Sequence, residues 1–335
     1  MSRIAVLGAG AWGTALAICL SRRWDHAVML WSHRPEHAAR LAEARENARY
    51  LAGYAFPEAL GVTGSLEEAV RGADAVLFVM PSQHVRAAAE AVRPLLAPGA
   101  LLVSAAKGIE ENTLLRMSQV LAAALGADAA RHPIGVLSGP SFAQEVAAGA
   151  PAAVTVAFAE AADGERAQAM LSTDTLRLYR SSDVVGVELG GALKNVIAIA
   201  AGAVVGLELG HNSGAALITR GIAELTRLCL ACGGRRETLA GLAGVGDLIL
   251  TCTGALSRNR FVGVELGRGR SLAEIVASLD GKVAEGVRTT DAALRLAERV
   301  GVDMPIATQV RAVLRGECSA GEAVRLLMAR PGREE

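Results

Sequence analysis

A lysine stands in an apolar, glycine-rich segment near the middle of this 335-residue chain. Lys194 precedes Asn195 and is flanked by leucine, valine, isoleucine and alanine between Val187 and Ala198. A lone ammonium is costly in such surroundings, and burial lowers the pKa of a lysine. A lysine that meets a carboxylate or a substrate there is suited to general acid or base catalysis. The alternative is a helix-surface lysine whose methylene stem covers apolar neighbours.

Four other segments combine polar side chains with glycine or with one another. Together with Lys194 they supply cations, an acid and hydrogen-bond donors that suit a phosphate group. Taken singly, each residue also has a plain explanation as a loop charge, a helix cap or a surface cation. The candidate substrate residues in these segments are Lys107, Gly139, Ser141, Asp247, Ser257, Arg258 and Asn259.

A glycine motif for dinucleotide binding lies near the start of the chain. Gly8, Gly10 and Gly13 follow a predicted strand, Ile4–Leu7, and precede a predicted helix, Thr14–Leu20. In this context the first glycine permits a tight turn, the second lets backbone approach a pyrophosphate, and the third lets the helix pack on the strand. The pyrophosphate then meets the free N–H groups of the helix N-terminus. The motif therefore predicts a dinucleotide cofactor.

The end of the second predicted strand, Val28–Trp31, indicates which nicotinamide cofactor binds. Ser32, His33 and Arg34 follow it, where NAD-selective folds commonly place a carboxylate for the ribose 2′-hydroxyl. Arginine and histidine pair well with a 2′-phosphate, and no carboxylate is present there to repel it. The sequence favours NADPH and leaves NADH open. The alternative for Arg34 is a solvated loop charge.

The predicted elements change in kind near Ser182. Before it, short apolar strands alternate with helical segments, which predicts an α/β, doubly wound (Rossmann-like) parallel sheet. After it, the pattern predicts an all-α region. We expect a dinucleotide-binding domain at residues 1–182 and a helical substrate and catalytic domain at residues 183–335.

The individual elements follow from apolar periodicity and capping patterns. The predicted strands are Ile4–Leu7, Val28–Trp31, Ala75–Val79, Leu101–Ser104, Gly135–Leu137, Ala153–Val156 and Leu176–Tyr179. The later helices are predicted at Ala38–Arg49, Val85–Val92, Leu114–Leu125, Val187–Leu207, Gly214–Cys232, Asp291–Arg299 and Thr308–Leu314, with capping boxes at Ser65–Glu68, Ser271–Glu274 and Ser319–Glu322.

Composition narrows the class of protein. Basic and acidic residues balance at 34 each, so no global field favours nucleic acid or an anionic membrane. No apolar run approaches the roughly 20 uninterrupted residues of a membrane helix, and the first residues enter a strand pattern at once, so we expect a cytoplasmic protein without a signal peptide. Five cysteines suggest reduced thiols, and Cys229 and Cys232 suit helix burial better than zinc. We expect no metal site.

These motifs together resemble bacterial NAD(P)-dependent sn-glycerol-3-phosphate dehydrogenase. The likeness runs in order from Leu7 to about Thr290, nearly the whole chain. GGALKN and LSGPS are far more specific than the glycine motif. Ala11 stands where relatives often have serine, which removes one hydroxyl contact to the cofactor. The matching strings are GAGAWGTALA, KGIE, LSGPSFAQEV, GVELGGALKNVIAIAAG, AALITRG, GVGDLILTCT, SRN and VAEGVRTT.

The resemblance implies a reversible reaction between sn-glycerol 3-phosphate and dihydroxyacetone phosphate that supplies glycerophospholipid synthesis. It implies that Lys194 is the general acid/base and that Asp247 orients it. Lys107 and Arg258 match positions that contact both cofactor and substrate. The remaining substrate contacts are Gly139, Ser141, Ser257 and Asn259. The cofactor contacts are Gly8, Gly10, Ala11, Trp12, Gly13, His33, Arg34, Tyr50, Lys107, Ala143, Arg258, Val283 and Glu285.

Two other functions remain open from the sequence. One is another dehydrogenase with a helical second domain that acts on a hydroxyacid or sugar acid. It does not predict the paired LSGPS and SRN segments. The other is a dinucleotide-sensing module without turnover, which does not need Lys194, Asn195 and Asp247. A homodimer is expected because symmetric pairs are the commonest soluble assembly.

Overall fold

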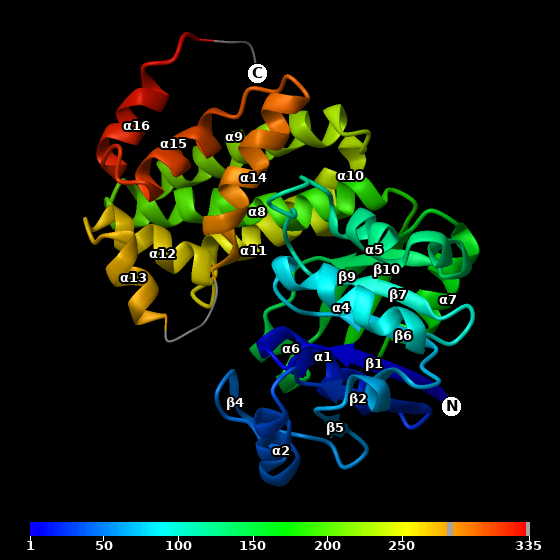
Figure 1. Cartoon of the computed structure of the whole chain (residues 1–335). Helices are drawn as coiled ribbons and strands as arrows, with labels where there is room; N and C mark the ends of the chain where they lie inside the picture. The colour runs from blue at the N-terminus through cyan, green and yellow to red at the C-terminus, as the bar shows by residue number, and fades with distance from the viewer. Residues whose placement is uncertain (280–283, 333–335) are drawn as a thin grey trace.

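The computed structural model describes residues 1–279 and 284–332 of the chain. Its first half is built on one eight-stranded sheet with helices on both faces (Figure 1). The strand order is β10-β9-β8-β7-β6-β1-β2-β5, and all neighbours are parallel except β8 and β9. The strands are β1 (Ser2–Leu7), β2 (His26–Trp31), β5 (Gly61–Thr63), β6 (Ala75–Phe78), β7 (Leu101–Ser104), β8 (Ile134–Ser138), β9 (Ala152–Phe158) and β10 (Leu176–Ser181), with a separate hairpin of β3 (Glu46–Asn47) and β4 (Leu51–Ala55).

Strand periodicity divides the apolar side chains between the two faces of the sheet. In β1, Ile4 and Val6 enter one core cluster, while Ala5 and Leu7 enter the cluster on the opposite face. Helices α1, α6 and α7 cover the first face, and α3, α4 and α5 cover the second. The doubly wound sheet is confirmed. The helices of this half are α1 (Ala11–Ser21), α2 (Pro35–Ala44), α3 (Leu66–Val70), α4 (Val85–Val92), α5 (Met117–Leu125), α6 (Ala143–Ala148) and α7 (Ala161–Leu171).

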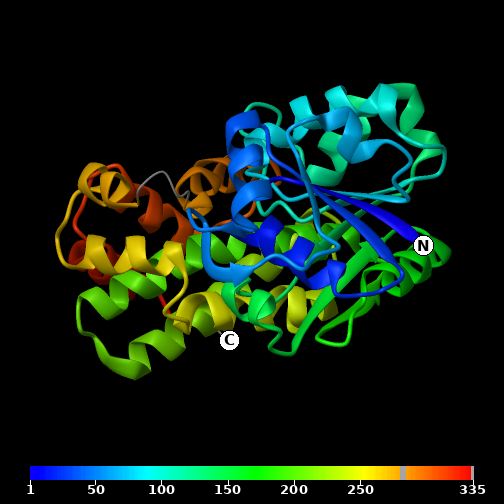
Figure 2. The ribbon, with the colours of Figure 1, turned by 90° about the horizontal axis from the view of Figure 1, so that it is seen from below.

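The second half is helical and is organised around α8. Viewed from below, α12 to α16 gather at one end of the molecule and the start of β1 lies at the other (Figure 2). The helical half has its own apolar core, to which α8, α9, α11, α12, α14 and α15 contribute. Its helices are α8 (Val184–Gly206), α9 (Gly210–Ala231), α10 (Arg236–Ala240), α11 (Asp247–Thr253), α12 (Arg258–Gly267), α13 (Leu272–Ser278), α14 (Glu285–Arg299), α15 (Pro305–Leu314) and α16 (Ala320–Met328).

Two glycines allow α8 and α12 to pack backbone against backbone. A Cβ at Gly263 would lie 1.9 Å from the carbonyl oxygen of Ile199, and a Cβ at Gly202 would lie 2.0 Å from that of Arg260. By length and composition α8 could cross a membrane, with a hydropathy of 1.6. However, 78% of its most apolar stretch is buried inside the protein, so α8 is a core helix.

Two predicted helices differ from the structure in their ends. The helix expected at Ala38–Arg49 ends at Ala44, because Arg45 adopts a left-handed conformation with φ 52° and its guanidinium donates to the carbonyl of Leu60. The helix expected at Leu114–Leu125 starts only at Met117, because Leu114 has φ 59°. These tertiary contacts override local helix propensity.

Helix caps behave mostly as predicted. Ser271 and Ser319 form complete capping boxes, so these two predictions are confirmed. Ser65 caps α3 through the N–H of Glu68, yet the Glu68 carboxylate accepts from the Thr63 hydroxyl instead of closing the box. The predicted sheet extension by Ala153–Val156 and Leu176–Tyr179 is confirmed as β9 and β10.

Candidate active site

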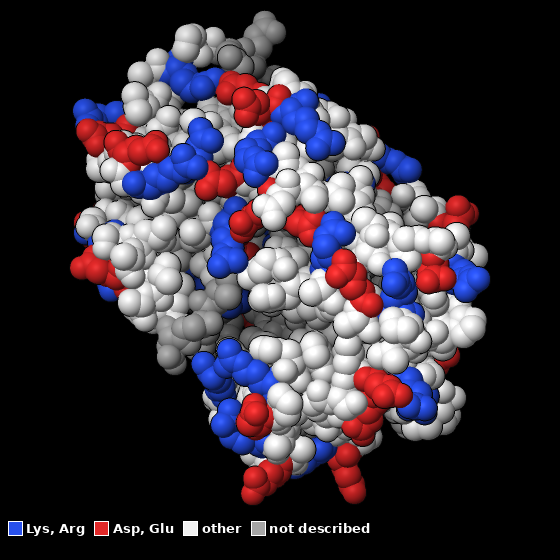
Figure 3. Space-filling view, viewed as in Figure 1, with Lys and Arg blue, Asp and Glu red and all other residues white. Residues whose placement is uncertain are grey.

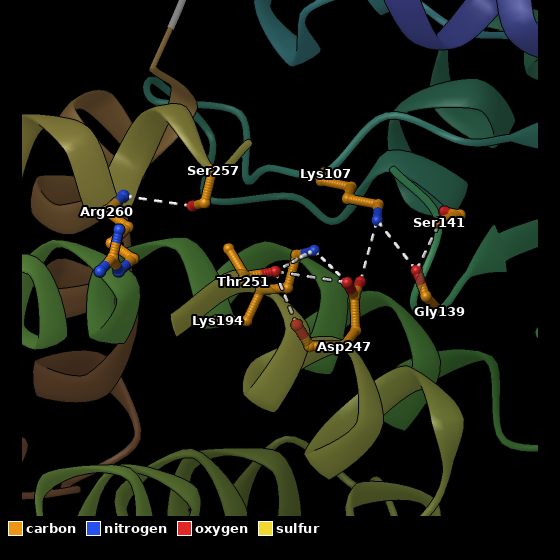
Figure 4. Close-up of polar contacts among 8 residues, drawn as sticks. All are labelled: Lys107, Gly139, Ser141, Lys194, Asp247, Thr251, Ser257 and Arg260. Atoms are coloured by element: carbon orange, nitrogen blue, oxygen red, sulfur yellow. Dashed lines mark hydrogen bonds and ion pairs between the residues drawn. The ribbon is translucent and has the colours of Figure 1, made fainter. Parts of the chain in front are cut away.

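Lys194 lies on α8 with its ammonium against the first turn of α11 (Figure 4). It pairs with Asp247 Oδ1 and donates to Thr251 Oγ1 at 2.9 Å. Thr251 in turn donates to the carbonyl oxygen of Asp247 at 2.6 Å. Only 7% of the Lys194 side chain and 1% of the Asp247 side chain are exposed. The ammonium is therefore buried and paired with a carboxylate.

Lys107 reaches the same carboxylate from the other half of the molecule. It follows β7, and its ammonium donates to Asp247 Oδ2 at 2.9 Å and lies 3.4 Å from the carbonyl oxygen of Gly139 (Figure 4). Ser141 donates to that same carbonyl at 3.1 Å. The Asp247 carboxylate therefore bridges two lysines from two structural units.

The electrostatics of this cluster leave Lys194 ready to exchange a proton. Burial lowers the pKa of Lys194 from 10.5 to about 7, although the charge of Asp247 opposes this fall and that of Lys107 adds to it. Burial alone raises the pKa of Asp247, but the two lysines hold it below its usual range. Asp247 is therefore ionised at neutral pH, while Lys194 titrates there.

The backbone around Asp247 is shaped to bring α11 against α8. A single π-helical turn, Leu242–Gly246, precedes Asp247, and such turns are common at functional sites. A Cβ at Gly190 would lie 2.5 Å from the carbonyl oxygen of Ala243. The glycine thus lets this turn touch α8 one turn before Lys194, which places Asp247 within reach of the ammonium.

The loop that carries Lys107 is anchored in both halves. Ile109 is buried in the helical core, and Glu110 forms two hydrogen bonds with Arg86 of α4 at 2.7 and 2.8 Å. At the far end of the loop, Arg116 pairs with Glu188 of α8. Because the loop is fixed at these points, the ammonium of Lys107 is held within hydrogen-bond distance of Asp247.

The segment from Ser257 to Asn259 begins α12 beside this cluster. Ser257 caps the helix by accepting from the N–H of Arg260 at 3.2 Å. Asn259 is buried and its Oδ1 accepts from the N–H of Gly286 at 3.0 Å. The cap of Ser257 and the inter-helix bond of Asn259 account for these two residues, and Arg258 is an exposed cation at the start of α12.

Glu285 starts α14 and faces the same cations. Burial raises the pKa of Glu285 to about 7, although the charges of Arg258, Lys107 and Lys194 act in the opposite direction. The structure thus brings together Lys107, Gly139, Ser141, Lys194, Asp247 and Thr251 by direct contact, with Arg258 and Glu285 close enough to interact by charge.

The glycine loop between β1 and α1 fits a dinucleotide. Gly8 has φ +123°, and a Cβ there would lie 2.4 Å from the carbonyl oxygen of Val79. A Cβ at Gly13 would lie 1.9 Å from the carbonyl oxygen of Gly8, whereas nothing lies within 4 Å of one at Gly10. Open space over Gly10 at the start of α1 suits a pyrophosphate. The indole N–H of Trp12 is buried without a hydrogen-bond partner in the part of the chain that the structure describes.

The other expected cofactor residues surround this loop. Ala11 and Trp12 occupy the first turn of α1, and Ala143 begins α6, which packs against α1. His33 and Arg34 are exposed at the end of β2. Tyr50 stacks edge-on against His37, with ring centroids 5.6 Å apart. Val283 lies outside the described residues.

Sequence reasoning missed several residues that act here through contacts. Thr251 lies one turn after Asp247 on α11, and this i, i+4 spacing was the only signal for it. Asn47 donates to the carbonyl of Ala9 at 3.0 Å and to Thr14 at 2.8 Å, so it supports the glycine loop. No local pattern marked Asn47, because the two partners of its Nδ2, Ala9 and Thr14, are more than 30 positions away.

Comparisons with known proteins cover both halves. Residues 3–163 match the family model described as NAD-dependent glycerol-3-phosphate dehydrogenase N-terminus, and residues 183–325 match the corresponding C-terminus model. The chain belongs to this dehydrogenase family. A glycerol-3-phosphate dehydrogenase [NAD(P)+] from Acidobacterium capsulatum is 59% identical over all of both chains. One from Koribacter versatilis is 54% identical, covering 100% of this chain and 99% of the relative.

A solved structure agrees with these relatives. The crystal structure of glycerol-3-phosphate dehydrogenase from Coxiella burnetii superposes with a TM-score of 0.92 at 39% identity, covering 98% of this chain and 99% of that one. The chain is therefore an NAD(P)-dependent oxidoreductase of the glycerol-3-phosphate dehydrogenase family. This decides against the hydroxyacid dehydrogenase and the non-catalytic sensor left open by the sequence.

Proposed function

We propose that this chain interconverts sn-glycerol 3-phosphate and dihydroxyacetone phosphate, with Lys194 as the general acid and base. The observation that carries the proposal is the buried Lys194–Asp247 pair, in which burial lowers the pKa of Lys194 to about 7. A group with a pKa near the working pH both donates and accepts a proton efficiently. When bound, the nicotinamide cofactor supplies or accepts the hydride.

Lys194 handles the proton at the C2 oxygen of the substrate. In the reducing direction its ammonium polarises the C2 carbonyl and gives up a proton to the oxygen. In the oxidising direction the neutral amine accepts the proton of the C2 hydroxyl. Thr251 and Asp247 hold the nitrogen in place, since both accept from it. Oxidation removes a hydride from C2 and a proton from its oxygen, and reduction returns both. The substrate therefore keeps the same net charge in either direction.

Asp247 and Lys107 set the charge that the substrate meets. Asp247 offsets the charge of Lys194, and Lys107 shares the carboxylate from the opposite side. Two lysines share the single negative charge of Asp247, so the cluster carries a net positive charge when Lys194 is protonated. This positive charge attracts an anionic substrate. We expect Asp247 also to orient a substrate hydroxyl.

The phosphate end of the substrate needs cations and hydrogen-bond donors. We assign this role to Arg258 and Asn259, with Ser141 and Ser257 as hydroxyl contacts and Gly139 as a backbone contact. Because the Oδ1 of Asn259 accepts from Gly286, its Nδ2 is the group that can donate to a phosphate.

For the cofactor we propose the glycine loop of Gly8, Gly10 and Gly13 together with neighbouring side chains. Glu285 interacts by charge with Arg258, Lys107 and Lys194 at the start of α14, which supports a contact with the cofactor near Lys107. The remaining contacts in this proposal are Ala11, Trp12, His33, Arg34, Tyr50, Lys107, Ala143, Val283 and Arg258.

We further propose two domains, residues 1–182 and 183–335, a cytoplasmic homodimer, and a role in supplying glycerol 3-phosphate for glycerophospholipid synthesis. The sheet ends at Ser181 and α8 begins at Val184, which supports this division. Separate expression of residues 183–335 tests it, since an autonomous domain gives a cooperative thermal transition. Size-exclusion chromatography with light scattering tests the dimer.

The activity is tested by absorbance at 340 nm with purified protein, dihydroxyacetone phosphate and either NADPH or NADH. Oxidation of the cofactor that requires the phosphate ester, and that fails with unphosphorylated dihydroxyacetone, supports the proposal. Binding of both cofactors without any turnover of the phosphate ester would sink the substrate assignment and leave the fold standing.

A further inference from the structure

Three arginines converge beside the end of β2. Arg34 caps α2, Arg40 lies two turns further along that helix, and Arg49 follows the first strand of the β3–β4 hairpin. None of the three forms an ion pair within residues 1–279 and 284–332. Like charges repel, so such a group without a carboxylate partner is suited to an anionic ligand.

A continuous chain of contacts joins Arg49 and Arg34 to the end of β2, while Arg40 acts on the same group by its charge. The Arg49 guanidinium lies 5.3 Å from the ring centroid of Tyr50, and the Tyr50 ring meets His37 edge-on at 5.6 Å. His37 Nδ1 lies 3.2 Å from the hydroxyl of Ser32, the residue that follows β2. The carbonyl of Arg34 accepts from the N–H of His37 at 3.0 Å. His37 is therefore the centre of the group.

The charge around His37 has a defined sign. Burial lowers the pKa of His37, and the positive charges of Arg40, Arg49 and Arg34 lower it further. The imidazole is therefore neutral at neutral pH, and the arginines supply the positive charge. Glu36 and Glu43 also lie on α2, four residues before and three residues after Arg40, where helical periodicity makes side chains neighbours. Neither forms an ion pair with Arg40 in the part of the chain that the structure describes. Basic side chains gather at the lower left of the molecule, over α2 and β4, with acidic side chains beside them (Figure 3).

The same segment is fastened to the dinucleotide loop. Asn47 donates to the carbonyl of Ala9 and to the hydroxyl of Thr14, and its Oδ1 lies 3.3 Å from the N–H of Tyr50. Arg49 lies between these two anchored residues. In a fold of this kind the adenosine ribose lies beside the end of the second strand, with its 2′ group directed to the residues that follow.

We infer that Arg49 and Arg40 join Arg34 in a phosphate-binding site that selects the 2′-phosphorylated dinucleotide over the unphosphorylated one. The inference rests on the proposed function for the identity of the cofactor, and it adds Arg40 and Arg49 as specificity residues. Guanidinium groups pair with phosphate oxygens through two parallel hydrogen bonds, so three of them around one dianion give both charge and geometry.

The steady-state test compares Arg49→Gln, Arg40→Gln and, as a matched control, Arg71→Gln. Arg71 is an exposed arginine of the same half that pairs with Glu67, and the residue after it, Gly72, lies beside Arg3 at the start of β1. For Arg49→Gln and Arg40→Gln we expect kcat/KM for NADPH to fall about 10- to 100-fold while kcat/KM for NADH stays within about twofold. Arg71→Gln should leave both unchanged. Equal losses for both cofactors, or no loss for either, would overturn the inference.

A binding experiment separates this inference from the reaction itself. Calorimetric titration compares adenosine 2′,5′-bisphosphate with adenosine 5′-monophosphate, neither of which needs turnover. The wild-type chain should prefer the bisphosphate, and Arg49→Gln should lose about tenfold or more of that preference. If this holds while dihydroxyacetone phosphate is not reduced, the phosphate site stands and the proposed function fails. Equal wild-type affinity for both nucleotides overturns the phosphate site, whatever the activity.

Discussion

Lys194 and Asp247 form an ion pair in which the carboxylate is almost completely buried and also binds Lys107. The chain has 34 basic residues, of which 31 are arginine and three are lysine: Lys107, Lys194 and Lys282. Two of these lysines meet on one carboxylate, and Lys282 lies outside the described residues. Arginine does not release its proton at physiological pH, whereas lysine does so when burial lowers its pKa. A lysine at position 194 is therefore suited to transferring a proton, whereas an arginine there would not be.

The pH dependence of the reaction follows from the pKa of Lys194, lowered by burial to about 7. Oxidation needs the neutral amine, so log kcat/KM for glycerol 3-phosphate should rise with pH and level off above about 7. Reduction needs the ammonium, so its rate constant should be level below about 7 and fall above it. Steady-state rates between pH 5.5 and 9 in both directions check this. Profiles of the same sign in the two directions would contradict it.

Asp247→Asn should shift that midpoint downward. The charge of Asp247 raises the pKa of Lys194, so its removal lets burial and Lys107 lower the pKa further. The oxidation profile should then move to lower pH, with kcat reduced about 100-fold because Lys194 is less well held. The matched control is Asp291→Asn, an exposed carboxylate paired with Arg315. An unshifted midpoint in Asp247→Asn would show that this carboxylate does not tune the lysine.

Thr251→Val removes one hydrogen bond from Lys194 while keeping the volume of the side chain. Lys194 loses an acceptor at 2.9 Å but keeps Asp247. We expect kcat to fall about tenfold with little change in KM, as for the loss of one hydrogen bond to a charged group. Thr251→Ser should restore most of kcat because it keeps the hydroxyl. A KM effect larger than the kcat effect would place Thr251 in substrate binding instead.

Much of this arrangement is visible in the sequence, for physical reasons that differ by residue. The strands are continuous apolar runs buried on both faces, so periodicity finds them. Lys194 stands out because its neighbours are apolar. Gly8, Gly10 and Gly13 stand out because strand and helix flank them. The capping boxes at Ser271 and Ser319 are local and equally readable.

The rest depends on contacts between distant segments, which no window of sequence contains. Lys107 and Asp247 are 140 positions apart, and only the fold shows that they share a hydrogen bond. Helix α2 ends just before Arg45, whose guanidinium donates hydrogen bonds to the backbone carbonyls of Pro57 and Leu60 in the loop after β4. The interaction of Glu188 with Arg116 is likewise long-range. Such tertiary bonds override local propensity and cannot be read from it.

Glu188 is expected to hold α8 in position against the loop that carries Lys107. Its carboxylate accepts from the N–H and the hydroxyl of Ser118, each at 2.7 Å, and pairs with Arg116. Burial raises its pKa, against the charge of Arg116. Glu188→Ala leaves a partly buried guanidinium, 16% exposed, without its carboxylate, so the free energy of unfolding should fall by about 1 to 3 kcal/mol.

Glu188→Gln is the conservative partner of that variant, since it keeps the size and one acceptor oxygen, although its amide NH2 cannot accept a hydrogen bond. It should lose less stability and recover most of kcat. Thermal melts and kcat measured on both variants check this. If Glu188→Ala has the melting temperature and the kcat of the wild type, the carboxylate has no positioning role.

The central claim is that Lys194 carries the proton, and Lys194→Ala tests it most directly. The measurement is the single-turnover decay of NADPH absorbance at 340 nm with saturating dihydroxyacetone phosphate, after cofactor binding has been verified by titration. The account predicts unchanged cofactor affinity and a rate about 10³-fold or more below wild type. A Lys194→Ala rate within tenfold of wild type, with cofactor bound, would contradict it.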